Sequence, residues 1–394
     1  MPADHEYGID ISPTNGDLSA AVTTINNDIG EPMTTTFTAD AFESSATGQM
    51  AQVPGSPERI SFTGSGSEYF RIWIVNLLLT IVTLGIYSAW AKVRRMRYFY
   101  DNTRLAGSSF EYHGDPISIL KGRIVAVVLF GGYNLALRYS PMLGLAMLAV
   151  LICLVPWLLW KSLQFKLYNS SYRGIRFGFR GTASRVYFVY LLLPFVALIS
   201  LYLALPFVHQ RIKKFQHEES RYGSTYFSFD ATVGNFYVVY LIGLGVMVAG
   251  LVVLGLGFSG TLVAVFGGVK GPKIAMTMMV LIFAVYAWMF MLIPVMMTLI
   301  QNLIWNHTKL GELRFTSDMK WTRVAFIAIT NVIGVVLTVG LFMPFARVRM
   351  MKYRLESMSM VPHGSLDNFI ATAQTEATAA GEGMADILDF DMSL

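Results

Sequence analysis

The chain has 394 residues, of which 54% are hydrophobic and only 14% charged, and its formal net charge at pH 7 is +5. Soluble domains usually carry about 25% charged residues, so this composition excludes an ordinary soluble enzyme and predicts a polytopic membrane protein. The single cysteine, Cys153, excludes an intrachain disulfide, and the Cys and His spacings match no zinc site.

Charge is distributed unevenly along the chain. All 30 Lys and Arg residues lie between 59 and 354, whereas 9 of the 25 acidic residues lie in 1–58 and 7 in 355–394. We therefore expect a strongly basic middle section with acidic ends. Because the basic residues adjoin apolar runs, binding to nucleic acid is a poor explanation for the pI of 9.1, and no nucleic-acid partner is predicted.

Residues 1–57 are polar and lack the basic and apolar regions of a signal peptide. Their composition predicts a disordered acidic N-terminal tail. The rest divides into a repeat-built transmembrane domain at 58–360 and an acidic C-terminal tail at 361–394. Opposite charge suggests that the acidic tails dock on the basic middle section of the same chain, and the alternative is a solvated tail.

A short stretch of alternating polar and apolar residues occurs five times, each time before an apolar segment that ends in a basic, aromatic exit. These strand-like stretches are 59–64, 108–115, 175–181, 225–230 and 313–318. The pattern predicts degenerate internal repeats, with short cytoplasmic β-strand and turn modules that could pair into a small sheet.

The first, third and fifth repeats each hold one apolar run, whereas the second and fourth each hold two. The single runs are 72–90, 186–208 and 324–345, and the paired runs are 124–137 with 142–160 and 236–258 with 274–300. Seven plain spans would place two basic exits outside the cell, against the positive-inside rule. Glycine or proline also interrupts each single run.

We therefore predict an all-α polytopic membrane protein with four full-spanning helices in two hairpins and three re-entrant helical hairpins. In this arrangement the strand modules and both termini are cytoplasmic. Seven plain spans remain the alternative, because run length alone suits them. The sequence makes no prediction about oligomeric state.

Three stretches carry a resemblance: FTGSGSEYFRIW at 62–73, TLGIYSAWAKVRR at 83–95 and GEGMADILDFD at 381–391. They resemble the YjgN-like bacterial inner-membrane family, whose members carry a domain of unknown function, and the resemblance covers about 59–394. It implies a multi-pass protein of the bacterial inner membrane. It implies no activity, substrate or catalytic residue.

Catalytic chemistry has little support in this sequence, because acid–base and metal sites need clustered carboxylates, His or Cys. No Asp or Glu occurs between Asp115 and Glu218. The one candidate cluster, His217 with Glu218 and Glu219, lies in a basic exit and is better explained as solvated charge. We predict a protein that is not an enzyme and has no cofactor or metal.

Five polar residues within the apolar runs are candidates for contact with a substrate at membrane depth: Asn76, Thr80, Thr83, Asn331 and Thr338. In one reading they hydrogen-bond between packed helices. In the other, broken helices present these groups to a small molecule or lipid that the protein binds or passes.

The basic-aromatic exits are candidates for contact with lipid headgroups, because Trp and Tyr favour that layer and Lys and Arg attract anionic lipid. The candidate residues are Trp90, Lys92, Arg94, Arg95, Arg97, Lys161, Arg211, Lys213, Lys214, Arg347 and Arg349. Two functions follow as hypotheses. The first is transporter- or channel-like binding and passage, and the second is a structural, membrane-organising role that depends on anionic lipids.

Overall fold

The structure is a computed structural model that describes residues 22–25, 33–36, 56–362 and 370. The chain divides into two compact units, Met1–Val53 and Pro54–Leu394. In the first unit, β1 (Val22–Ile25) pairs antiparallel with β2 (Met33–Thr36). The predicted disorder of 1–57 concerns mainly residues outside the described ranges and stays a prediction.

The second unit is built on an antiparallel sheet of eleven short strands, in the order β3-β13-β12-β11-β10-β9-β8-β7-β6-β5-β4. The strands are β3 (Glu58–Arg59), β4 (Ser61–Phe62), β5 (Thr103–Leu105), β6 (Ser108–Tyr112), β7 (Ser170–Tyr172), β8 (Ile175–Phe179), β9 (Ser220–Tyr222), β10 (Thr225–Phe229), β11 (Thr308–Leu310), β12 (Leu313–Ser317) and β13 (Met358–Pro362). From β4 to β13, strands that follow one another in the chain are neighbours in this sheet, so the topology is a simple meander.

The two ends of the strand order are joined through the chain itself. Only Ile60 separates β3 from β4, and its N–H donates to the Met358 carbonyl at 3.0 Å. On one side β3 pairs with β13, and on the other β4 pairs with β5. The extended segment 58–62 therefore links both edges, and the sheet nearly closes into a barrel that leaves little free edge.

The interior of this barrel is apolar. Its buried residues are Ile60, Leu105, Tyr172, Ile175, Tyr222, Leu310, Leu313, Met358, Met360 and Ile370, packed with Phe110, Phe177, Phe227, Trp305, Phe315 and Leu355. A cavity of about 160 Å³ remains among these side chains, and all its lining residues are apolar or aromatic. Ile370 reaches this core from beyond β13, so one side chain of the C-terminal segment is part of it.

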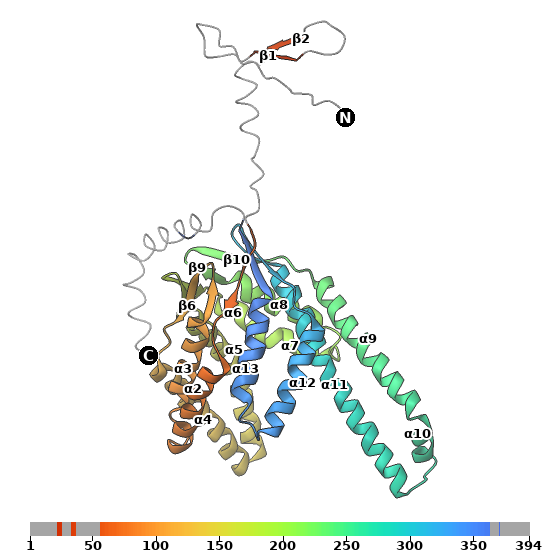
Figure 1. Cartoon of the computed structure of the whole chain (residues 1–394). Coiled ribbons are helices and arrows are strands. Elements are labelled where there is room, and N and C mark those ends of the chain that lie inside the picture. Colours follow the sequence, from red (N-terminus) through yellow and green to blue (C-terminus); the bar gives the residue numbers. More distant parts are fainter. Residues whose placement is uncertain (1–21, 26–32, 37–55, 363–369, 371–394) are drawn as a thin grey trace. The chain divides into compact units, whose positions relative to one another are not determined.

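Five helical segments each leave the sheet and return to it (Figure 1). They are α2 (Gly66–Val82) with α3 (Ser88–Asp101), α4 (Pro116–Tyr139) with α5 (Pro141–Tyr168), α6 (Ala183–Tyr187) through the π-helical η1 (Phe188–Leu192) and α7 (Leu193–Ile199) to α8 (Leu205–Glu218), α9 (Val233–Gly257) through α10 (Ser259–Phe266) to α11 (Pro272–Asn306), and α12 (Trp321–Leu337) with α13 (Met343–Glu356). Successive segments pack side by side, and α13 packs against α2, so they form a ring.

Three of these segments turn back at a tight corner of the same kind. In the α12–α13 corner, Val339 and Gly340 have φ of 49° and 92°, and the Thr338 hydroxyl accepts the Phe342 N–H at 2.8 Å. Thr83 and Ser200 make the same bond to the N–H four residues later in the other two corners, at 2.9 and 3.0 Å. A hydroxyl that replaces a missing backbone partner stabilises such a turn.

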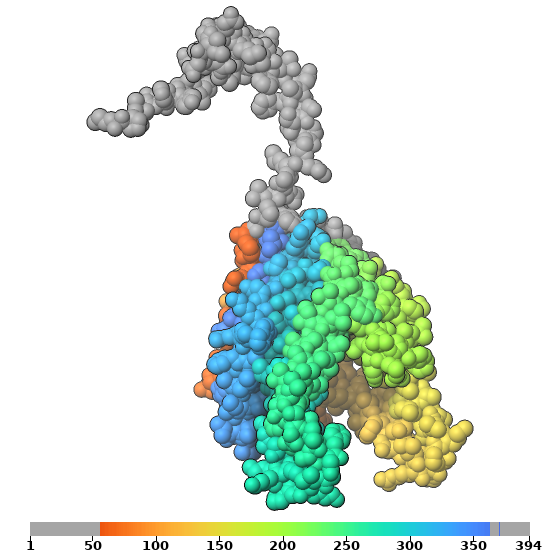
Figure 2. Space-filling model, turned by 90° about the vertical axis from the view of Figure 1, so that its right-hand side faces the viewer, coloured from red at the N-terminus to blue at the C-terminus, as the bar shows by residue number. Residues whose placement is uncertain are grey.

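These corners decide how the single apolar runs fold. The runs 72–90, 186–208 and 324–345 are each divided between helices that meet at a corner, so none of them is one long helix. Within the described residues, four helices are long and apolar enough to cross a membrane: α4, α5, α9 and α11. Figure 2 shows that the yellow α4–α5 pair and the green-to-teal α9–α11 segment project farther from the sheet than the rest.

The all-α fold class predicted from the sequence is wrong, because the structure contains the eleven-stranded antiparallel sheet. The five strand-like stretches do contain strands, but five further strands lie in and after the basic-aromatic exits. Four of these, such as β5 and β7, have only three residues and include Arg, Lys or Ser, so they show no apolar alternation. Pairing across the sheet, rather than local propensity, makes them strands.

Closure of the barrel predicts two disulfide cross-links. Cysteines at Ser61 and Arg104 should cross-link, and so should cysteines at Arg59 and Ser359, because each pair is directly opposed in the register. Opposed antiparallel residues have Cα atoms about 4.5–5.5 Å apart, within the range of a disulfide. The measurement is the mobility of oxidised and reduced protein on a gel.

The cross-linking needs a Cys153→Ser background, because Cys153 is the chain's one native cysteine. The matched control pairs Ser61→Cys with Arg176→Cys, an exposed position on β8, four strands from β4 in the sheet. This pair should not cross-link. If one of the two designed pairs fails to cross-link while the other succeeds, the sheet is open on the side of the failing pair.

Candidate functional site

Asn331, one of the predicted membrane-depth residues, joins the two arms of its own hairpin. It lies on α12 with 8% of its surface exposed. Arg349 of α13 donates to the Asn331 Oδ1 at 2.9 Å and to the Thr330 hydroxyl at 3.1 Å. The Asn331 amide donates in turn to the Ala346 carbonyl at 3.1 Å. We call this arrangement the Asn–Arg clamp.

Asn76 makes the corresponding contact in the α2–α3 hairpin, where Arg94 donates to its Oδ1 at 3.5 Å. Thr80 donates to the Asn76 carbonyl at 2.6 Å, and Thr83, like Thr338, caps a corner. The hydrogen bonds of these five predicted residues thus stay within their own hairpins. Two predicted membrane-depth residues, Asn76 and Asn331, therefore bind two predicted headgroup residues, Arg94 and Arg349 respectively.

Most of the other predicted headgroup residues have a local partner. Lys214 lies 3.6 Å from Glu218, Lys161 lies over Trp160 at 5.4 Å, and Arg211 lies over Phe207 at 5.2 Å. Trp90 stacks on Tyr87 at 6.2 Å, Arg347 contacts the Met343 sulfur at 3.8 Å, and exposed Arg97 lies near Asp101. Lys92, Arg95 and Lys213 are half-buried on helices α3 and α8.

The sequence candidate His217–Glu218–Glu219 does not form a joint site. His217 stacks on Phe229 and hydrogen-bonds with the Thr308 hydroxyl at 3.3 Å, and burial, followed by the charge of Lys213, lowers its pKa to about 4. Glu218 pairs with Lys214 and Glu219 with Arg185. In the described part of the chain, no group of three or more His, Cys, Asp or Glu side chains is placed to hold a metal.

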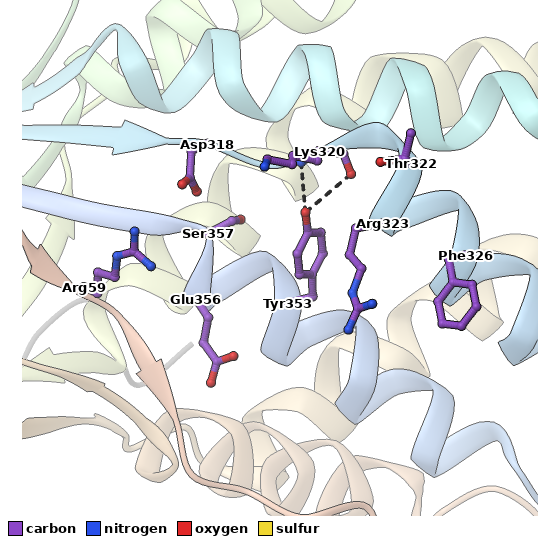
Figure 3. A pocket seen from close by; sticks show the side chains of 9 residues that line it. All are labelled: Arg59, Asp318, Lys320, Thr322, Arg323, Phe326, Tyr353, Glu356 and Ser357. Atoms are coloured by element: carbon purple, nitrogen blue, oxygen red, sulfur yellow. Dashed lines mark hydrogen bonds between the residues drawn. The ribbon is translucent and has the colours of Figure 1, made fainter.

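A groove lies where β3, α12 and α13 meet (Figure 3). Its volume is about 610 Å³, and it is lined by Arg59, Asp318, Lys320, Thr322, Arg323, Phe326, Tyr353, Glu356 and Ser357. Figure 3 shows Arg59 and Glu356 toward one end, and Arg323 and Phe326 toward the other. We call it the α12 groove.

Backbone and side-chain bonds fix the shape of the α12 groove. The Tyr353 hydroxyl accepts the Lys320 N–H at 2.9 Å and lies 3.4 Å from the Lys320 carbonyl, to which it donates. The Asp318 N–H donates to the Ser357 carbonyl at 3.0 Å. These bonds hold the β12–α12 loop against the end of α13, so the groove is preformed.

The α12 groove is cationic and opens beside an apolar helix face. Arg59, Lys320 and Arg323 supply three positive charges. Of its two carboxylates, that of Glu356 lies 3.8 Å from the Nζ of Lys352, which is not one of the lining residues. Further along α12, Phe326, Ile333 and Leu337 are exposed. A ligand made of a phosphate and a hydrocarbon chain would place its phosphate near these cations and its chain along the exposed apolar residues of α12.

Sequence reasoning did not select Arg59, Lys320 or Arg323. Lys320 directly precedes Trp321 at the start of an apolar run, which is a pattern that could have marked it. Arg59, by contrast, is more than 250 residues away in the chain, and only the pairing of β3 with β13 brings it to the groove.

Comparison with known proteins identifies relatives. A family model described as a bacterial protein of unknown function, DUF898, matches residues 57–387. The inner membrane protein YjgN of Salmonella typhimurium is 35% identical over 148 residues, which cover 36% of this chain and 37% of that protein. The protein of the same name from Escherichia coli K12 is 32% identical over 146 residues, covering 36% and 35%. The chain thus spans about a third of the length of the curated relatives it matches, and no solved structure matches it.

The Asn–Arg clamp predicts a structural role for Asn331. Asn331→Leu should lower the free energy of unfolding by about 1.5–3 kcal/mol, because it removes a partly buried hydrogen bond to a charged group. Asn134→Leu is the matched control, since Asn134 is exposed and bonds only within α4. The measurement is thermal unfolding in detergent. Unchanged stability in Asn331→Leu would favour a substrate-contacting role for this residue instead.

Proposed function

We propose, from the premise that this chain belongs to the DUF898 family of bacterial proteins, that it holds an anionic phospholipid in the α12 groove at the cytoplasmic face of the inner membrane. Its four long apolar helices, together with relatives named inner membrane proteins, make it an integral membrane protein. The resemblance found in the sequence is confirmed by the family match. The proposed role is binding rather than catalysis and needs no cofactor.

We infer the topology of the chain in the membrane from the sheet. All five helical segments begin and end at strands of one sheet, so the strand hairpins share one side of the membrane. The exits that lead back to this sheet are rich in Lys and Arg, which the positive-inside rule assigns to the cytoplasm. On this basis we infer a multi-pass protein with a cytoplasmic sheet, and with both chain ends on the cytoplasmic side.

We infer how deeply each hairpin enters the membrane from the residues at its corner and from its length. The corners of the three shorter hairpins are apolar and exposed: Leu84 is 94% exposed, Val339 93% and Leu201 83%. By contrast, the far ends of the longer hairpins carry Arg138 or Lys270. Helical rise places Val339 only about 12 Å beyond Arg347, against about 30 Å of hydrocarbon. We infer that these three hairpins re-enter, and that α4–α5 and α9–α11 cross.

The same order of strand, turn and strand in four hairpins supports an internal repeat. Four strand hairpins consist of a three-residue strand, a turn with a positive-φ glycine, and a five-residue strand. The glycines are Gly107, Gly174, Gly223 and Gly311, with φ of 78°, 80°, 58° and 56°. Glycine suits these positions because other residues are strained there. Among the described residues, the strand of the fifth exit, β13, pairs with β12 and with β3 instead of with a following hairpin strand.

The observation that carries the lipid proposal is the α12 groove. Its three cations lie where the apolar surface of α12 begins, so a headgroup phosphate in the groove leaves the acyl chains along the helix. Each Lys or Arg near anionic lipid contributes roughly 1 kcal/mol. A passage role would need a polar path at membrane depth, and Asn76 and Asn331 are engaged within their own hairpins. Lipid holding is therefore the better-supported function.

Cysteine labelling tests the topology. In a Cys153→Ser background, Lys270→Cys should react with a membrane-impermeant maleimide added to intact spheroplasts. Glu312→Cys, exposed at the β11–β12 turn, should react only after the membrane is opened. Val339→Cys should stay unreactive in both conditions, because hydrocarbon surrounds it. Labelling of Val339→Cys or Glu312→Cys from outside would reject the re-entrant arrangement.

Lipid retention tests the groove. The triple variant Arg59→Gln, Lys320→Gln and Arg323→Gln should lose roughly 3 kcal/mol of binding, or about a hundredfold in affinity for phosphatidylglycerol. Native mass spectrometry of gently extracted protein measures the lipid that remains bound. High salt should weaken binding to the unaltered protein, because part of the attraction is screened.

The matched control for the groove removes three exposed arginines of the sheet. Arg104, Arg176 and Arg314 lie on β5, β8 and β12, outside the α12 groove, and their change to Gln removes the same charge. This variant should retain phosphatidylglycerol. If both triple variants lose lipid equally, the attraction belongs to net charge and not to the groove.

A further inference from the structure

The inner face of the barrel carries a row of four stacked phenylalanines. Phe110, Phe177, Phe227 and Phe315 occupy the central positions of β6, β8, β10 and β12, and the centroids of successive rings lie 6.5, 6.5 and 6.2 Å apart. All four rings are only half-buried, and they line the cavity of about 160 Å³. Protein interiors hold few voids larger than a water molecule. This aromatic row therefore has room for a further group.

The cavity suits an apolar group and not a polar one. The Tyr172 hydroxyl donates to the Leu105 carbonyl at 2.7 Å, and the Tyr222 hydroxyl donates to the Tyr172 carbonyl at 2.9 Å. The other lining side chains are hydrocarbon, thioether or indole. A water molecule or a phosphate in this cavity would lack the polar partners that it needs. An apolar side chain, by contrast, would gain contacts with the phenylalanine row.

The C-terminal segment already supplies one side chain to this cavity. Helices join the strands at one end of the barrel, and the hairpin turns lie at the other, which we call the turn end. Pro362, the last residue of β13, is paired with Leu313, which directly follows the β11–β12 turn. The chain therefore leaves the sheet at the turn end. Ile370, eight residues further on, is 7% exposed and lines the cavity.

Exposed arginines flank the turn end on the outer face of the barrel. On three strands an arginine is the chain neighbour of a buried core residue: Arg104 of Leu105, Arg176 of Ile175 and Arg314 of Leu313. Because side chains alternate between the two faces of a strand, these arginines point away from the core. The turn end thus presents positive charge on the outside and an apolar cavity within.

Basic residues outnumber acidic ones three to one on the sheet. The eleven strands contain six Lys or Arg and two Glu. Of the ion pairs among the described residues, none involves Arg104, Arg176 or Arg314. Arg314 also lies directly opposite Lys309 in the register, and like charges so placed destabilise the strand pair. An acidic segment on this face would relieve that repulsion.

The C-terminal segment of this chain has the complementary pattern. Residues 363–394 contain six Asp or Glu and no Lys or Arg. No large apolar residue occurs in 371–383, and the stretch DILDFD at 386–391 then places Ile, Leu and Phe among three Asp. The family match begins at 57 and extends to 387, so it includes most of this segment but none of 1–56. The chain from 370 to 387 reaches about 55 Å when extended, enough for a return to the barrel.

We propose that the acidic C-terminal segment docks on the turn end of the barrel of its own chain. Ile370 is the first contact, the apolar side chains of 387–390 enter the cavity, and the adjacent Asp residues lie against Arg104, Arg176 and Arg314. An occupant that alternates Asp with apolar residues fits both surfaces at once. The anchor at Ile370 keeps the rest of the segment at a high effective concentration near the barrel.

Photocrosslinking of the full chain in native membranes tests this docking. The change Phe390→benzoylphenylalanine keeps an apolar aromatic side chain at the position, and mass spectrometry identifies the peptides that it joins after irradiation. The cross-links should map to strands β5–β12 of the same chain. High salt should lower their yield, because ionic attraction is screened.

Charge removal on the sheet should abolish most of this cross-linking. The variant Arg104→Gln, Arg176→Gln and Arg314→Gln changes only exposed side chains, so the fold should be kept while the cross-links are lost. The matched variant Lys121→Gln, Lys161→Gln and Lys352→Gln removes three exposed cations from α4, α5 and α13. This second variant should keep the cross-links.

A probe in the other acidic end of the chain is the matched control for tethering. Phe42 lies 16 residues before Glu58, and Phe390 lies 20 residues after Ile370. Phe42→benzoylphenylalanine should not join the barrel. The proposal is overturned if the Phe390 probe fails to reach the barrel, if its cross-links join two chains, or if the arginine variant retains them. Loss in the lysine variant, or equal cross-linking from Phe42, would show general attraction between charges and would overturn it too.

Discussion

Backbone hydrogen bonds between neighbouring strands hold the two ends of every helical segment together. Each segment leaves from one strand and returns to the next, and the 58–62 segment joins the last strand to the first. Because each segment begins and ends at this sheet, its helices are held together as a hairpin. Within the described residues, only the α4–α5 and α9–α11 segments contain helices long and apolar enough to cross a membrane.

Two kinds of hydrogen bond stabilise these hairpins. Hydroxyls of Thr83, Ser200 and Thr338 satisfy backbone groups at the corners, where apolar surroundings would leave them without water. Asn76 and Asn331 bond to arginines of the returning arm and hold the two arms together. The polar groups inside the apolar runs are therefore explained by the hairpins' own hydrogen bonds.

The basic residues near the helix ends differ in how much negative charge lies beside them. Outward cations such as Lys214 and Lys161 have a carboxylate or an aromatic ring beside them. The α12 groove holds three cations but only two carboxylates, and one of these, Glu356, already pairs with Lys352. Unbalanced charge of this kind favours an anion from outside the chain. The α12 groove lies at the start of the apolar helix α12, where a phospholipid headgroup would lie in the proposed arrangement.

The sequence by itself determined the membrane class, the apolar runs, the position of a strand before each helical segment and the family, because hydropathy and residue order are local properties. It also indicated the breaks at Gly85 and Gly340, since glycine favours their positive φ. Only the tertiary structure decided the strand at the end of each exit, the closure through Ile60, and the position of Arg59 in the same groove as Arg323. Strands of two or three residues exist because partners distant in the chain satisfy their hydrogen bonds, and no local pattern records those partners.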